Sequence, residues 1–126
     1  MGPIIDSDGD IAELVPWFEE VGVDGFLPLE KRAGTDIAAI RERSPRCRII
    51  GAFDKNVMTL GEGSMREEFE RLLPIMRQGG YIPGVDHQTT PHVSIEQYRA
   101  YVALLREYCV LGAEPSGYGR LLEPAE

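Results

Sequence analysis

The chain has 126 residues, which is the usual length of one domain. Its 13 basic and 21 acidic residues give a net charge of −8, which disfavours binding to nucleic acid or to an anionic membrane. No apolar run approaches the ~18–20 residues of a membrane span, and Cys47 and Cys109 form neither a disulfide framework nor a C-x-x-C motif. We therefore expect a soluble, reduced, cytoplasmic domain.

Four short apolar runs predict strands. None of them alternates cleanly with polar residues, and continuous apolar runs of this length are typical of strands that are buried on both faces of a parallel sheet. The four runs cover residues 3–5, 26–29, 49–53 and 81–85.

Apolar residues at helical spacing follow each run. They predict helices over residues 11–21, around residues 37–40, over residues 65–76 and over residues 95–109. Pro16 and Pro74 lie inside the first and third patterns and are expected to kink or restart those helices. Three segments resemble capping boxes at helix starts: Asp10 with Glu13, Ser64 with Glu67, and Ser94 with Gln97.

The predicted order is a strand and a helix repeated four times. This alternation indicates an α/β fold with a parallel sheet and right-handed connections. The four units occupy residues 1–109, and residues 110–126 are expected to form a loosely ordered tail.

Each predicted strand ends in ionisable residues. The carboxyl ends of parallel strands meet at one edge of a sheet, where α/β folds place their sites, so we expect these side chains to gather there. Carboxylates held so close need a cation, such as Lys31, Lys55 or a metal ion, or some of their pKa values rise. The alternative is that polar strand ends meet water. The carboxylates are those of Asp6, Asp8, Glu30, Asp54 and Asp86.

Two of these clusters suggest particular ligands. Asp6 and Asp8 alternate along the chain, so both can point to one metal ion; the alternative leaves them solvated. Gly9 comes too early in the segment for a calcium-binding EF-hand loop. His87 follows a strand and is either a metal ligand, a general acid or an exposed histidine.

A third cluster is basic. Lys31 and Arg32 precede a helix N-terminus, where they either help to hold a carboxylate or phosphate or lie in a solvated loop. We interpret the arginine run at positions 41, 43, 46 and 48 as solvated, because its first members stand near a helix C-terminus that favours positive charge.

Several segments, taken in order, resemble one family. From Ile5 to about Tyr108 the chain resembles the carboxyl-terminal half of the uroporphyrinogen decarboxylase superfamily. The matching segments are Asp6-Ser7-Asp8-Gly9-Asp10-Ile11, residues 20–28, Gly51-Ala52-Phe53-Asp54-Lys55, and Gly79-Gly80-Tyr81-Ile82-Pro83 followed by Asp86, His87 and Pro91.

The resemblance implies half of a (β/α)₈ barrel, because a whole barrel takes ~250 residues. It implies that His87 matches the histidine that closes the decarboxylase site. It also implies that Asp6-Ser7-Asp8-Gly9 stands where the zinc-dependent methyltransferase branch has His-x-Cys-Gly. The substrate-binding arginines and the catalytic aspartate of the decarboxylase belong to the half that this sequence lacks.

Three functions follow as hypotheses. The first is metal-assisted methyl transfer involving a corrinoid, with a corrinoid protein as a possible partner. The second is decarboxylation of a tetrapyrrole in porphyrin biosynthesis. The third is a non-catalytic half-barrel that pairs with itself or with an amino-terminal half-barrel.

The expected site residues fall into three groups. Asp6, Asp8 and His87 are expected to hold zinc or another divalent metal. Glu30, Lys31 and Arg32 are expected to bind the cofactor. His87, Asp54 and Lys55 are expected to be catalytic.

Overall fold

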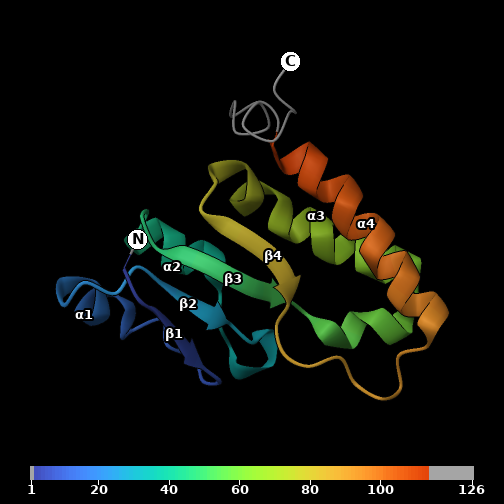
Figure 1. Ribbon diagram of the computed structural model, residues 1–126, viewed down its shortest axis with the longest axis horizontal. Coiled ribbons are helices and arrows are strands. Elements are labelled where there is room, and N and C mark those ends of the chain that lie inside the picture. The colour runs from blue at the N-terminus through green and yellow to red at the C-terminus, as the bar shows by residue number, and fades with distance from the viewer. Residues whose placement is uncertain (1, 114–126) are drawn as a thin grey trace.

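Four parallel strands form one sheet in the order β1-β2-β3-β4, and each strand except the last is followed by helical segments that lead to its neighbour (Figure 1). The structure is a computed structural model and describes residues 2–113. Its elements are β1 Ile4–Ser7, α1 Val15–Glu20, β2 Gly25–Pro28, η1 Lys31–Ala33, α2 Ile37–Arg43, β3 Arg48–Phe53, η2 Lys55–Leu60, α3 Glu62–Gln78, β4 Tyr81–Val85 and α4 Ile95–Ala113, where η marks a 3₁₀-helix.

The predicted fold class is confirmed. All three strand pairings are parallel, and the apolar runs form the strands with shifts of only one or two residues at their ends. The strands alternate with helices, as in a partial (β/α)₈ barrel. No helix in the described part of the chain has the length and apolar character to cross a membrane.

The core lies between the sheet and its helices. Phe26 of β2 and Ile49 of β3 are paired in register, and both are about 1 % exposed beneath the helices. An aromatic cluster joins β3, α3 and α4: the Phe69 ring lies 4.5 Å from Phe53, 5.8 Å from Tyr101 and 5.2 Å from Tyr108 between ring centroids. Such pairs add ~0.5–1.5 kcal/mol each beyond the area they bury, so this cluster fixes α3 and α4 on the sheet.

Two predicted helix starts are wrong. The first helix begins at Val15, with Pro16 in its first turn, where a missing N–H costs nothing; Asp10 instead accepts a hydrogen bond from Ala12 N at 3.1 Å. The third begins at Glu62 rather than at a cap on Ser64, and it continues through Pro74 to Gln78.

The last helix confirms its predicted start and corrects its predicted end. Ser94 N donates to Gln97 Oε1 at 2.8 Å, and Gln97 N donates to Ser94 Oγ at 3.1 Å, which is a complete capping box. α4 includes residues 110–113, which we expected in the tail. Residues 114–126 of that expected tail lie outside the described residues.

Candidate functional site

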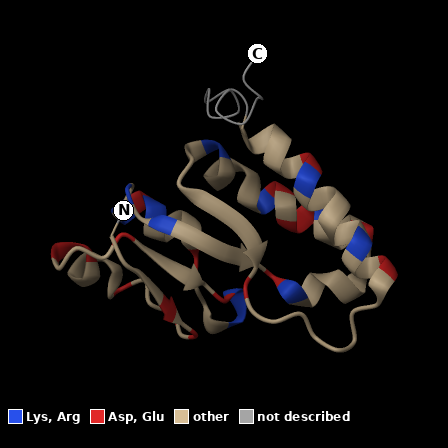
Figure 2. Cartoon of the chain, viewed as in Figure 1, with Lys and Arg blue, Asp and Glu red and all other residues tan. Residues whose placement is uncertain are grey.

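The loops that follow the four strands meet at the carboxyl edge of the sheet, as the parallel topology requires. Charged residues of both signs gather near the strand arrowheads in Figure 2. Two different assemblies lie here: a buried network under η1 and η2, and an open pocket between the ends of β1 and β4.

Asp86 is the centre of the buried network. Its side chain is fully buried, and its two oxygens accept hydrogen bonds from Lys31 N at 2.9 Å and from Lys55 N at 3.2 Å. Burial raises the pKa of the Asp86 carboxyl, and the two amide hydrogen bonds partly oppose that rise. One carboxylate at the end of β4 therefore holds the first residues of both η1 and η2.

Glu68 of α3 is a second buried carboxylate in this network. It is 4 % exposed, accepts a hydrogen bond from Asp54 N at 2.8 Å, and pairs with Arg71 and, at 3.8 Å, with Lys31 Nζ. We did not predict this residue from the sequence. Its position was readable, because it stands three residues after Met65 and four before Leu72 on the buried face of the helix.

The predicted residues Asp54 and Lys55 also have partners in the network. Asp54 accepts hydrogen bonds from Asn56 N at 3.0 Å and from Asn56 Nδ2 at 2.9 Å, so it caps η2. Lys55 Nζ lies 3.5 Å from Glu30 Oε1, with both side chains largely buried. The cation that we expected among these carboxylates is thus supplied by Lys55 and Lys31, whereas Arg32 is exposed on the surface.

The open pocket contains the three residues predicted to hold a metal. It has a volume of about 550 Å³ and is lined by residues 6–8 after β1, by Leu27 and Pro28 of β2, and by His87 and Gln88 after β4. His87 Nε2 lies 3.6 Å from Asp8 Oδ1, and the two side chains are 39 % and 78 % exposed. This separation is longer than a direct hydrogen bond and too short for an atom to lie between the two groups, so both can face the same bound molecule.

The fit of this donor set to a metal is incomplete. Asp6, Asp8 and His87 line one pocket, but only Asp8 and His87 are in contact. Among residues 2–113 no group of three His, Cys, Asp or Glu side chains is arranged to hold a metal ion. The metal assignment of these three residues stays a prediction, as do the catalytic and cofactor-binding roles.

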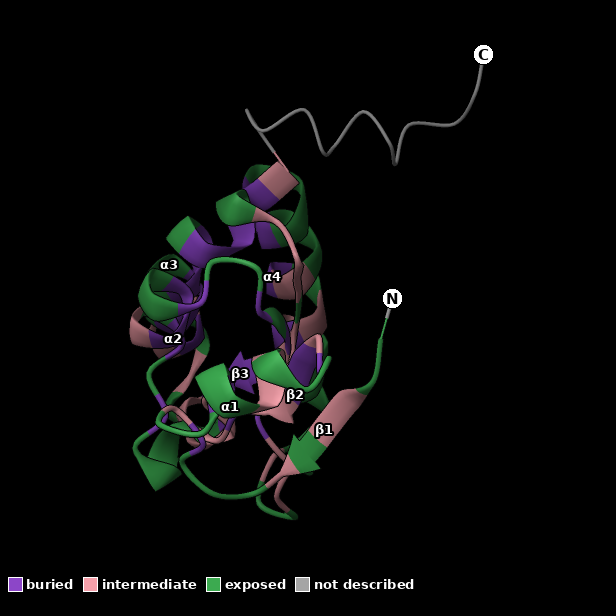
Figure 3. Ribbon diagram, turned by 90° about the vertical axis from the view of Figure 1, so that its left-hand side faces the viewer, coloured by how far each residue is buried: buried purple, intermediate pink, exposed green. Residues whose placement is uncertain are grey.

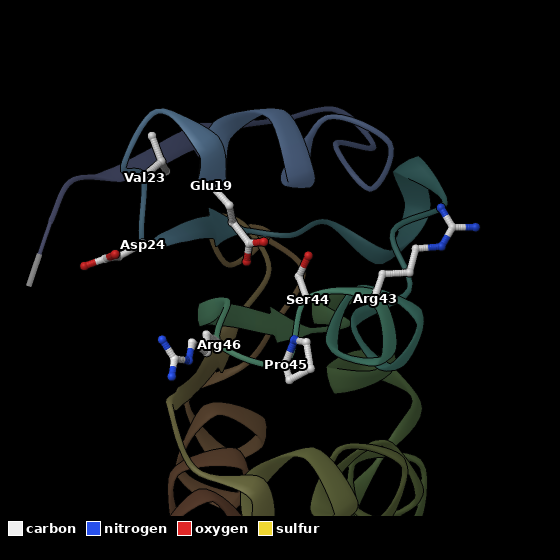
Figure 4. Close-up of a pocket in the computed structure, with 7 residues that line it drawn as sticks. All are labelled: Glu19, Val23, Asp24, Arg43, Ser44, Pro45 and Arg46. Carbon is white, nitrogen blue, oxygen red and sulfur yellow. The ribbon is translucent and has the colours of Figure 1, made fainter.

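A smaller pocket of about 310 Å³ lies at the opposite, amino-terminal edge (Figure 4). Figure 4 shows Glu19 and Ser44 pointing toward each other, while Arg43 and Arg46 point away from them. Because the two arginines point away from Glu19 and Ser44, these four side chains do not surround a common ligand position. This edge is also the one at which α/β barrels rarely place chemistry.

Arg41, near the same edge, is buried, so our interpretation of the whole arginine run as solvated is wrong for this residue. It is only 5 % exposed rather than solvated, and it donates to Cys47 O at 2.7 Å, to Gln78 Oε1 at 3.2 Å and to Gly80 O at 2.8 Å. Burial lowers its pKa. Its partners connect the ends of α2 and α3, so its role is structural.

Comparison with known proteins gives one match. The family model described as Uroporphyrinogen decarboxylase (URO-D) matches residues 3–108. Searches of the curated proteins and of the solved structures find no match. The matched segment contains all four strands, the buried network and the open pocket, and it covers most of the chain. The chain therefore belongs to the uroporphyrinogen decarboxylase family.

Proposed function

We propose that the open pocket performs acid–base chemistry of the decarboxylase kind on a tetrapyrrole, with His87 as the proton donor. The observation that carries this proposal is the placement of His87 Nε2 at 3.6 Å from Asp8 Oδ1 inside the pocket. A carboxylate beside an imidazole orients the ring. The pair is a suitable donor for a single proton.

The reaction needs such a donor. Loss of CO₂ breaks the bond to the carboxyl carbon and leaves the electron pair on the remaining carbon, which then takes one proton. His87 would donate that proton and would then be reprotonated by solvent water, which reaches it through the open pocket. Asp6, at the same pocket, supplies oxygens that accept hydrogen bonds from the pyrrole N–H groups of the substrate.

The test is the rate at which the chain releases CO₂ from uroporphyrinogen, compared with matched histidine variants. His87→Gln is expected to lower the rate about 10²–10⁴-fold with little change in binding, because an amide fills the space but donates no proton. His92→Gln, which changes the other histidine, at an exposed position, is expected to keep the wild-type rate. A His87→Gln variant that is as active as the wild type would overturn the proposal.

A second candidate is metal-assisted methyl transfer involving a corrinoid. It is supported by the presence of two carboxylates and one imidazole, those of Asp6, Asp8 and His87, around a single pocket. Metal analysis by mass spectrometry on the purified chain and on His87→Ala separates the two candidates. Zinc that is bound by the wild type and lost in the variant favours methyl transfer, whereas a wild type that binds no metal rejects it.

A further inference from the structure

The helices cover only one face of the sheet (Figure 3). Ile50 and Ile82 are paired in register and point to the other face; Ile50 is half-buried, and Ile82 is 64 % exposed. Ile4 and Leu27, on the neighbouring strands, are also half-buried, and neither packs against the core. Because parallel sheets are normally covered on both faces, this apolar face needs an occupant.

Both edges of the sheet are also open. β1 and β4 stand at the ends of the strand order, so each pairs on one side only within residues 2–113. The two edges point the same way, because every pairing in the sheet is parallel. The free edge of β4 can therefore pair with the β1 strand of another chain in the parallel orientation, which continues this sheet.

The helix beside each open edge carries exposed apolar residues. At α1 they are Trp17 and the two cap residues Leu14 and Val21, which are 69 %, 40 % and 77 % exposed. On α4, Ile95 and Tyr98 in the first turns are 68 % and 45 % exposed and Val110 near the end is 64 % exposed, whereas Val102 and Leu105 between them pack against the core.

The two helices differ in charge: the charged residues of α1 are all acidic, whereas α4 has Glu96 and Glu107 beside two arginines. Glu13, Glu19 and Glu20 lie on or next to α1, and no basic residue lies between positions 11 and 22. On α4, Arg99 and Arg106 are exposed and form no ion pair with any residue that the structure describes. In Figure 2 the acidic end of α1 and α4, which carries residues of both signs, lie at opposite sides of the molecule. Arg99 and Arg106 of one copy can thus pair with the glutamates beside α1 of another copy.

We propose that two copies of this chain pair around a two-fold axis into an eight-stranded barrel. β4 of each copy lies beside β1 of the other, α1 packs on the α4 of the partner copy, and the apolar face of each sheet is covered by the other. A second copy fits both edges at once, and two sets of four strands make the eight that close such barrels. This pairing does not depend on the proposed reaction.

The pairing also completes the open pocket. The carboxyl ends of the strands of both copies then lie at one end of the barrel. The pocket formed by Asp6, Asp8 and His87 is therefore lined by loops of the partner copy as well as by loops of its own chain. Closure around a two-fold axis further explains why the apolar edges need not produce fibres, because no free edge remains after two copies have paired.

Sedimentation equilibrium of the full chain tests the pairing, with Trp17 as an internal reporter because it is the only tryptophan. The expected mass is twice that of one chain at micromolar concentration, with tryptophan emission that shifts to the red on dilution. Trp17→Glu is expected to raise the dissociation constant at least about tenfold. The control Leu60→Glu changes an apolar residue on η2 that is 70 % exposed and lies outside the proposed contact, and it is expected to leave the dimer intact.

Three results would overturn the proposal. The first is a folded single-chain mass at all concentrations with the tryptophan already in water. The second is growth into species larger than two chains. The third is a one-to-one complex with a separately expressed chain of four preceding βα units, formed at the expense of the two-copy species, which would identify that other chain as the occupant.

Discussion

Asp86 is the residue on which the candidate site depends most. It has no exposed surface, and its carboxylate accepts main-chain hydrogen bonds from both Lys31 and Lys55. Asp86→Asn leaves one acceptor oxygen for two donors and turns an amide N–H toward the second. Because an unsatisfied buried donor costs ~1–3 kcal/mol, we expect the free energy of unfolding at pH 7 to fall by about that amount.

The control and the pH dependence both follow from the same geometry. Asp36 is an exposed carboxylate that caps α2, and asparagine caps a helix equally well, so Asp36→Asn is expected to change stability by a few tenths of a kcal/mol.

Burial raises the pKa of folded Asp86 above its ordinary 3.8. The proton-linked stabilisation is therefore complete below pH 3.8 and is lost as the pH rises through the folded pKa. Denaturant titrations from about pH 4 to 7 should show the advantage of the wild type over Asp86→Asn shrinking with pH; an advantage that grows would contradict this account.

At the scale of elements, β3 is shaped by its backbone. Gly51 has φ +104°, and a Cβ added there would lie 2.3 Å from Pro28 O of β2. Ala52 also has a positive φ, of 68°, and its carbonyl accepts a hydrogen bond from Arg71. The register between β2 and β3 stops at Ile49, two residues before this close approach. Glycine at position 51 therefore lets the two strands approach closely at this point.

Gly51→Ala tests that role. The positive φ and the contact with a backbone oxygen together are expected to cost about 2–4 kcal/mol of the free energy of unfolding. Gly63→Ala is the matched control, because Gly63 lies in α3 with nothing within 4 Å of an added Cβ, and we expect a gain of about 0.5–1 kcal/mol. Thermal unfolding of the two variants side by side gives the answer, and equal melting temperatures would refute the close approach.

The sequence predicted some elements better than others for a physical reason. The strands were recognised because short continuous apolar runs bounded by turn residues occur mainly in strands buried on both faces, and the capping box of Ser94 and Gln97 was found because both partners are local. Asp10 and Ser64 carry the same pattern without starting a helix. At those positions the true start depends on Pro16 and on the φ of +104° at Gly61. The short 3₁₀-helices were not predicted, because Asp86 holds their first residues from far along the chain.

On the scale of the whole molecule, topology was predicted and contacts were not. Alternating units require that acids such as Asp6, Asp54 and Asp86 meet at one edge, and they do. Whether an acid is buried in a network, as Asp86 is, or exposed in a pocket, as Asp8 is, depends on which loops fold over it. Spacing along the chain carries no signal for that difference. The ion pair between Lys55 and Glu30 could not be predicted from the sequence for the same reason.

We propose that ligand binds at the carboxyl edge, in the pocket between the ends of β1 and β4. The most direct measurement is a titration of the ¹⁵N-labelled chain with uroporphyrin, a non-reacting tetrapyrrole, followed by amide chemical shifts. We predict saturable shifts at Asp8, Leu27, His87 and Gln88, with none at Val23 or at residues 43–46 around the amino-edge pocket. Shifts confined to the amino edge, or the absence of any saturable shift, would show that no tetrapyrrole binds in this pocket.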